Sequence, residues 1–323
     1  MMIGAENTED RSGYDVLGLF RMAAPERSEE LEVLVDRYHP AFVVATDQPR
    51  FLLDASPSLG FVRYRNRTLL QVWVLAWAMW KEMYCWSSEL RFLAQGHKPF
   101  VLAEFEALPG QAQSYADADA VYLEAMAFAR SDPMDWGSWP SKVPKPFDIA
   151  SGTKEDWLIK DFVHHALAFF FLHELHHVAS HHDSRPFDSR HEEELECDRW
   201  AAEFLLARSD GYAAAASEDP VKVKSKRATG VALGTAVIAH IQELGLWEAG
   251  MRHPSIAERM KGLASALDLP ATDLSWTVAC SFLLASLRRR GVLPQRIEFH
   301  DPRDLFMKLL ARATTDSAGR ALA

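Results

Sequence analysis

The feature that most constrains the fold is a long apolar segment in the middle of the chain. From Trp157 to Leu172 apolar side chains occur on nearly all sides of a helical wheel. A helix of this kind is stable only when a core surrounds it. Thr153, followed three residues later by Asp156, is a typical helix start. We therefore predict a buried helix that runs to about His181 and ends before Pro186.

The rest of the chain indicates more helices and little sheet. Trp73, Trp77, Trp80 and Tyr84 recur every three or four residues within a predicted helix at 69–93, which favours core packing over a ligand site. Further helices are predicted at about 192–208 and from Pro254 onward. Short runs at 41–46, 50–54 and 61–64 are rich in Phe, Val and Leu, and turn residues separate them. The predicted fold class is mainly α with a small antiparallel β element.

The length suits one large domain or two small ones, and we predict a single domain over residues 1–323. Apolar residues make up 48% of the chain, enough for one sizeable core. We divide this domain into an N-terminal tail, helix and β element (1–68), a helical half that includes a loop rich in Pro and Trp (69–150), and a second helical half (151–323). The chemically distinctive residues all lie in the last part.

Charge and cysteine content restrict the class of protein. The net charge is −10, and because phosphate binding needs a basic face, nucleic acid is not expected as the main partner. The three cysteines are far apart in sequence, which argues against a disulfide framework and for a reducing compartment. No secretory signal and no run of about 20 apolar residues is present, so no membrane partner is expected and we predict a cytoplasmic protein.

The predicted buried helix carries the chemical motif. His173, Glu174 and His177 form H-E-x-x-H. Residues four apart share one face of a helix, so both imidazoles can reach one metal ion. Glu174 then lies beside the open position of that ion, where it can accept a proton from water.

The third ligand is expected from the next predicted helix. Glu194 and Asp198 are four residues apart and share a face with small residues, which would let this helix pack closely against the first. We predict Glu194 as the ligand and Asp198 as the acceptor of a hydrogen bond from the second nitrogen of a ligand histidine. Glu193 and Glu196 compete with Glu194, or are solvated acids at a helix start.

Other ligand sets stay open at this point. His173, His177 and His181 form an alternative row along one helix face. Cys197 is either a ligand or a small buried residue. The remaining nearby histidines that could contribute are His164, His165, His176, His182 and His191.

Taken together, these motifs are similar to those of the gluzincin class of zinc metallopeptidases, so the fold is expected to be zincin-like. A further segment, His253-Pro254-x-x-x-x-Arg259, resembles one found in HtpX-type and CAAX-prenyl-type metallopeptidases. That resemblance implies that His253 and Arg259 lie near the zinc and help to hold the tetrahedral intermediate. The alternative is that His253 only starts a helix and that Arg259 makes a surface ion pair.

Because membrane spans are lacking, the chain looks more like the Lit-type phage-exclusion peptidases over residues 66–84 and 157–260. This resemblance implies a zinc endopeptidase of the cytoplasm that acts on a protein or peptide substrate, with a role in antiviral defence. An activating partner of unknown identity is left open, as is a latent state in which the loop at 131–148 covers the cleft. The alternative function is a non-catalytic interaction or regulatory protein with a structural zinc.

Overall fold

The computed structural model describes residues 15–45, 51–131, 136–146, 152–241 and 253–320. Over these residues the fold is mainly α with a small β element, as predicted. The helices are α1 (Val16–Ala23), α2 (Ser28–Tyr38), α3 (Asn66–Met83), α4 (Ser87–Gln95), α5 (Leu102–Glu106), α6 (Gln111–Arg130), α7 (Lys154–His182), α8 (Arg190–Leu206), α9 (Ser209–Ala216), α10 (Pro220–Ile241), α11 (Ile256–Ala266), α12 (Leu274–Arg289) and α13 (Pro302–Arg320). The strands are β1 (Ala41–Val44), β2 (Leu53–Ser56), β3 (Phe61–Tyr64), β4 (Phe100–Val101) and β5 (Arg296–Ile297), and the 3-10 helices are η1 (Pro25–Arg27), η2 (Pro57–Leu59) and η3 (Trp136–Ser138).

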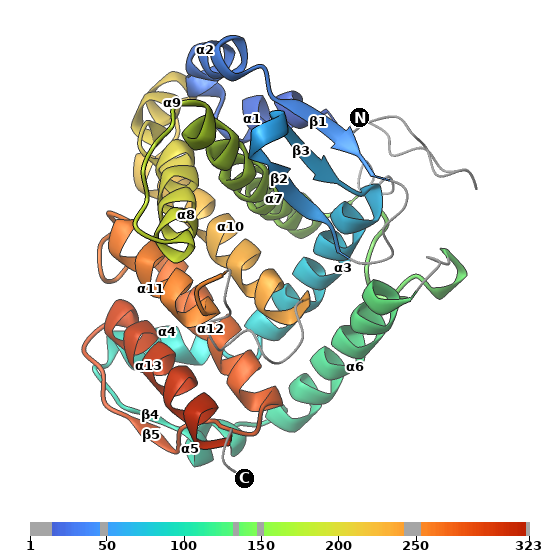
Figure 1. Cartoon of the computed structure of the whole chain (residues 1–323). Coiled ribbons are helices and arrows are strands. Elements are labelled where there is room, and N and C mark those ends of the chain that lie inside the picture. Colours follow the sequence, from blue (N-terminus) through green and yellow to red (C-terminus); the bar gives the residue numbers. More distant parts are fainter. Residues whose placement is uncertain (1–14, 46–50, 132–135, 147–151, 242–252, 321–323) are drawn as a thin grey trace.

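Helix α7 is the predicted buried helix, and it packs between the sheet, α8 and α10 (Figure 1). The predicted start is confirmed, because the Asp156 N–H donates to the Thr153 hydroxyl at 3.2 Å while the Thr153 N–H donates to the Asp156 carboxylate at 2.6 Å. Nearly every residue between Phe162 and Ser180 is buried. The helix is therefore held on all sides, which gives a rigid support to the motif that it carries.

Close approach of α10 fixes the position of α7. A Cβ at Gly230 would overlap the Cβ of His165 and lie 3.1 Å from the carbonyl oxygen of Phe162. One turn later, a Cβ at Gly234 would lie 3.2 Å from the Cβ of Ala166. Two glycines one turn apart thus let the backbones of the two helices meet, which larger residues would prevent.

The three-stranded sheet has the order β1–β3–β2. Strand β2 is antiparallel to β3, as expected, but β1 is parallel to β3, so the expectation of an entirely antiparallel element was wrong for β1. The reason is the short turn at Gly60 (φ 69°), which joins β2 to β3 as a hairpin. Strand β1 takes the remaining side of β3, and the outer edge of β2 is left facing α7.

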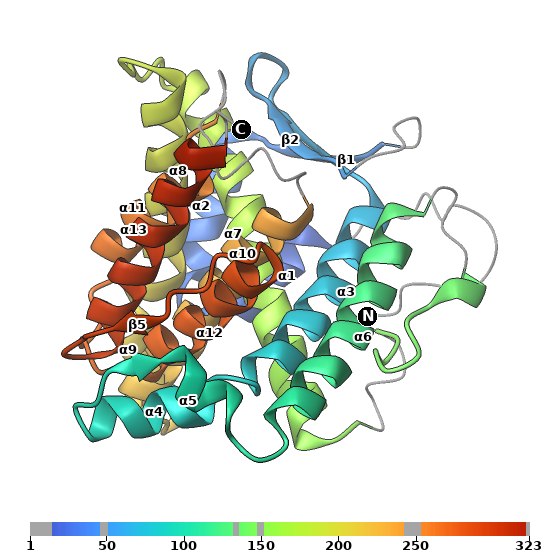
Figure 2. The ribbon, with the colours of Figure 1, turned by 90° about the horizontal axis from the view of Figure 1, so that it is seen from below.

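The predicted helix at 69–93 is divided into α3 and α4. Trp73, Trp77 and Trp80 are buried in the core, as the spacing predicted. Tyr84 is half exposed and lies after the end of α3, so it does not continue the stripe. Helices α3 and α6 lie side by side (Figure 2).

The described part of the loop at 131–148 packs on α3 and α6. The indole N–H of Trp73 donates to the carbonyl of Pro144 at 2.8 Å, and the Ser141 N–H donates to the Glu124 carboxylate at 2.8 Å. Trp139 also contacts Phe128 of α6 edge to face. These contacts hold residues 136–146 against α3 and α6. That the loop covers the cleft in a latent state stays a prediction.

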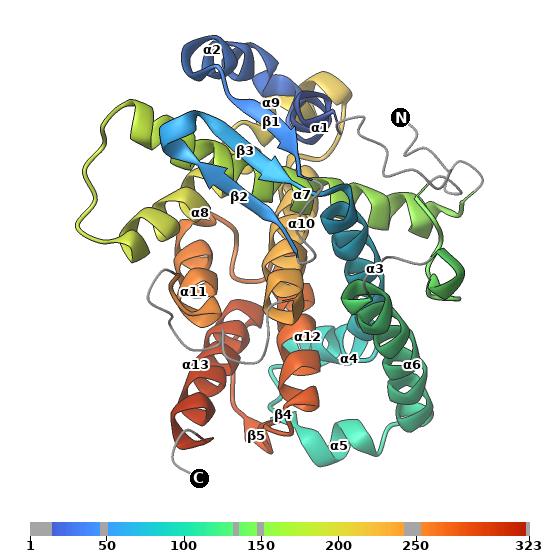
Figure 3. The same ribbon diagram turned by 45° about the vertical axis from the view of Figure 1, so that its right-hand side comes forward.

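The last part of the chain returns to the segment between α4 and α5. Strand β5 pairs with β4 there, with Phe100 opposite Ile297 (Figure 3). Helix α13 packs against both α11 and α12. No helix in the described ranges has the length and hydropathy of a membrane-spanning segment.

Candidate metal centre

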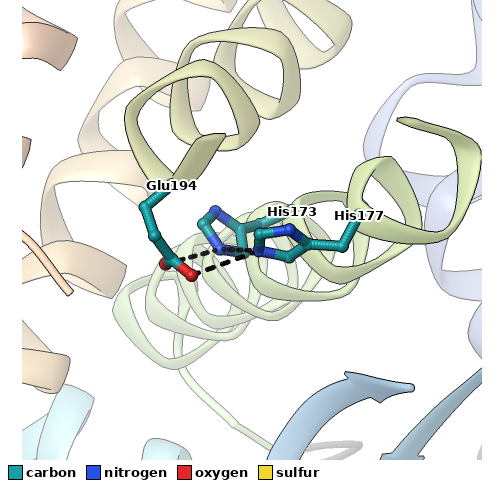
Figure 4. A group of neighbouring side chains, drawn as sticks. All are labelled: His173, His177 and Glu194. Atoms are coloured by element: carbon teal, nitrogen blue, oxygen red, sulfur yellow. Dashed lines mark hydrogen bonds and ion pairs between the residues drawn. The ribbon is translucent and has the colours of Figure 1, made fainter. Parts of the chain in front are cut away.

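Helices α7 and α8 bring together the three predicted metal ligands, His173, His177 and Glu194 (Figure 4). The two Nε2 atoms are 3.2 Å apart. Glu194 Oε2 lies 3.4 Å from His173 Nε2, and Glu194 Oε1 lies 3.5 Å from His177 Nε2. All three residues are buried, and over the described residues they form the one group of three such side chains close enough to share an ion.

These separations fit a zinc ion. Tetrahedral zinc with ligand atoms at about 2.0–2.1 Å holds those atoms about 3.3–3.4 Å apart, and the measured separations run from 3.2 to 3.5 Å. Each imidazole turns its Nδ1 to a carboxylate, so its Nε2 lone pair faces the common point. Two imidazoles and a carboxylate are also a usual donor set for catalytic zinc.

The second nitrogen of His173 faces Asp198, as the spacing predicted. His173 Nδ1 lies 2.9 Å from Asp198 Oδ1. Arg259 donates two hydrogen bonds to the same carboxylate, at 2.7 and 2.6 Å. Burial alone would raise the pKa of Asp198, but Arg259 and His173 lower it to about 2, so the carboxylate is ionised.

Arg259 lies near the ligand group, as the resemblance implies, and it contacts that group through Asp198. It is buried on α11, and its two recorded hydrogen bonds both go to Asp198. It is not a surface ion pair, which was the alternative interpretation. Its guanidinium reaches the ligand group through Asp198 and His173.

Glu193 lies outside the group of three close side chains, and it is not a solvated acid. Its Oε1 lies 2.8 Å from His177 Nδ1, and its Oε2 accepts a hydrogen bond from Arg190 at 2.7 Å. The sequence placed Glu193 among the competitors but could not show that it contacts the second histidine. That contact depends on the angle at which α8 crosses α7.

The other candidates stay outside the ligand group. Glu196 pairs with Arg185 at 3.0 Å and also with Arg199. His181 is exposed at the end of α7 and does not extend the histidine row inward. Cys197 is a buried thiol whose Sγ lies 3.4 Å from His177 Nδ1, behind the imidazole.

Glu174 lies beside the ligand group and is held by the sheet. The backbone N–H of Ala55, on the outer edge of β2, donates to Glu174 Oε2 at 2.7 Å. Burial raises the pKa of the Glu174 carboxyl, while the two imidazoles and this N–H lower it. Sequence reasoning missed Ala55 because a backbone group leaves no signal in the side-chain pattern.

His253 approaches from the segment before α11. Its Nδ1 lies 3.1 Å from Glu194 Oε2, and its side chain is half exposed. A capping box between Ser255 and Glu258 fixes the start of α11 two residues later. His253 thus lies at the solvent side of the ligand group, in contact with one of the ligands.

Comparison with known families identifies the chain. A family model described as peptidase U49 matches residues 62–279, more than half of the sequence. The chain belongs to the peptidase U49 family. This is the Lit-type family that the motifs resemble, and it is a family of metallopeptidases. Searches of curated proteins and of solved structures gave no significant match.

The range matched to the U49 family contains α7, α8 and α11, and therefore both histidines, Glu194 and Arg259. Strands β1 and β2 precede it, so the Ala55 contact to Glu174 is a feature of this U49 peptidase that the match does not include. Burial alone would raise the pKa of Glu194, but the neighbouring imidazoles of His173, His177 and His253 hold it far below its usual range. An ionised carboxylate is the form that binds a metal.

Proposed function

We propose that this U49 peptidase is a zinc-dependent endopeptidase of the gluzincin type, with His173, His177 and Glu194 as the zinc ligands. The observation that carries the proposal is the convergence of three ligand side chains, 3.2 to 3.5 Å apart, beside the glutamate of the same H-E-x-x-H helix. A structural zinc site is usually closed and rich in cysteine. The donor set here is typical of a catalytic site instead.

Zinc bound by this group would supply a Lewis acid that polarises the scissile carbonyl. Glu174 accepts a proton from the attacking water and later donates it to the amine that leaves. The Ala55 N–H holds one oxygen of Glu174, which leaves the other free for the proton transfer. We assign to His253 the stabilisation of the developing oxyanion, because its side chain contacts Glu194 and is half exposed to solvent.

Arg259 and Asp198 position His173 in this mechanism. Arg259 fixes the Asp198 carboxylate with two hydrogen bonds, and Asp198 in turn fixes the ring of His173. A carboxylate behind a ligand imidazole sets both its tautomer and its orientation. We therefore assign Arg259 a positioning role.

The substrate is proposed to be a protein or peptide, as for the family. A place in the cytoplasm, an activating partner and a part in defence against phage are implied by the resemblance to Lit-type peptidases and stay predictions.

The test combines metal analysis with activity. We expect about one zinc per chain in the purified protein, zinc but no cleavage of a peptide library in Glu174→Gln, and neither in His177→Ala. His181→Ala, one turn further along α7 at an exposed position, is the matched control and should keep both. Full zinc in His177→Ala would overturn the ligand set. Zinc without cleavage of any peptide or lysate protein would favour the non-catalytic alternative.

A further inference from the structure

Both ligand imidazoles are backed by a carboxylate, and both carboxylates are held by an arginine. Behind His173 the pair is Asp198 with Arg259, and both are buried. The equivalent pair behind His177 is Glu193 with Arg190. The second pair differs in its setting, because the Arg190 side chain is 44% exposed.

Arg190 is the first residue of α8, directly after the N-cap Ser189. Its Nη1 donates to Glu193 Oε2 at 2.7 Å, and its Nη2 lies 3.2 Å from Glu194 Oε1. The two carboxylates are consecutive along the helix, and one planar guanidinium spans them. A lysine at this position would keep the charge but could not bridge two carboxylates with the same fork geometry.

We propose that Arg190 is a positioning residue that holds Glu193 against His177. One oxygen of Glu193 faces His177 Nδ1 and the other is held by Arg190, so the carboxylate cannot rotate away from the imidazole. His177 is then kept with its Nε2 lone pair directed at the ligand group. This inference rests on the proposed function, since it concerns the orientation of a zinc ligand.

A substitution of Arg190 that keeps the positive charge tests this positioning role. A neutral residue in place of Arg190 would lose the bridge and would also remove a positive charge that repels the metal ion. These two changes would have opposite effects on zinc affinity. Arg190→Lys avoids this problem because only the bridging geometry is lost. Loss of such an outer contact typically lowers metal affinity about 10–100-fold. We expect zinc affinity to fall about tenfold in Arg190→Lys.

The experiment measures zinc affinity by chelator competition for the unaltered protein, Arg190→Lys, Glu193→Gln and the double variant. The visible spectrum of the cobalt-loaded protein reports ligand geometry independently of activity and should change in Arg190→Lys. The positioning role places the effect of Arg190 in its contact with Glu193 and not in its 3.2 Å contact with Glu194, so the double variant should bind zinc no more than about twofold more weakly than Glu193→Gln alone. Arg199→Lys is the matched control, since Arg199 lies on the same helix and pairs with Glu196 and Glu203.

Unchanged zinc affinity and an unchanged cobalt spectrum in Arg190→Lys would overturn the inference, as would additive losses in the double variant. Circular dichroism of the metal-free proteins should be identical, which excludes loss of fold as the cause. If the unaltered protein bound no zinc, the proposed function itself would fail. Zinc binding that depends on His177 but not on Arg190 would refute only the positioning role.

Discussion

Replacement of Arg259 by Met tests the buried pair that supports His173. Arg259 and Asp198 are 8% and 1% exposed, and two hydrogen bonds of 2.7 and 2.6 Å join them. Arg259→Met fills a similar space but leaves the buried Asp198 carboxylate without the two hydrogen bonds of its guanidinium partner. Removal of one partner of a buried ion pair costs about 3–5 kcal/mol of unfolding free energy. We expect a loss of that size in the metal-free protein at pH 7.

The assay is urea unfolding in the presence of a chelator, with two comparison variants. Asp198→Asn combined with Arg259→Met removes both charges, so it should recover a large part of the loss. Arg199→Met removes an arginine whose side chain is 47% exposed in its ion pairs, and it should cost less than about 1 kcal/mol. The reasoning is refuted if Arg259→Met costs no more than Arg199→Met, or if the double variant is less stable than the single one.

The remaining predictions concern the edge strand, helix packing and acid stability. Ala55→Pro removes the N–H that holds the base, so cleavage should slow at least tenfold while zinc content stays unchanged. Gly230→Ala should cost about 1–3 kcal/mol of unfolding free energy through overlap with α7, whereas Gly211→Ala, where nothing lies within 4 Å, should be neutral or stabilising. Burial lowers the pKa of His240 from 6.5 to about 3, so only the unfolded chain takes up its proton between these pH values and stability falls on acidification through this range. Between pH 7.5 and pH 5 the unaltered protein should therefore lose about 2 kcal/mol more unfolding free energy than His240→Gln loses.

Much of the core and of the ligand group could be predicted from the sequence. The apolar run before His173 predicted a buried helix, and α7 extends from Lys154 to His182 with nearly all of its second half buried. The four-residue spacing from Glu194 to Asp198 correctly placed both side chains on the face of α8 that meets α7. Such predictions succeed because helical periodicity fixes which residues share a face before any tertiary contact forms.

What could not be predicted depends on the angle between elements. Glu193 and Glu194 are neighbours on α8, and the sequence gives no reason why one faces Nδ1 of a histidine and the other faces Nε2. The contact from Ala55 depends on which edge of the sheet lies against α7, and the parallel placement of β1 determines that edge. Arg259 was assigned to the right region, but its partner followed only from the packing of α11 on α8.

The charge balance of the group also supports the proposed divalent cation. Four carboxylates surround the two imidazoles, and two guanidinium groups pair with them, which leaves two negative charges in a largely buried site. The carboxylates are those of Glu174, Glu193, Glu194 and Asp198, and the guanidinium groups are those of Arg190 and Arg259. Uncompensated buried charge is costly, so a dication is the simplest occupant that balances the group.

Without a dication, burial would lower the pKa of His173, but Asp198 and Glu194 raise it to about 10, so a proton takes up part of the charge. A metal ion that binds near neutral pH must then displace this proton, and the two compete for the same lone pair.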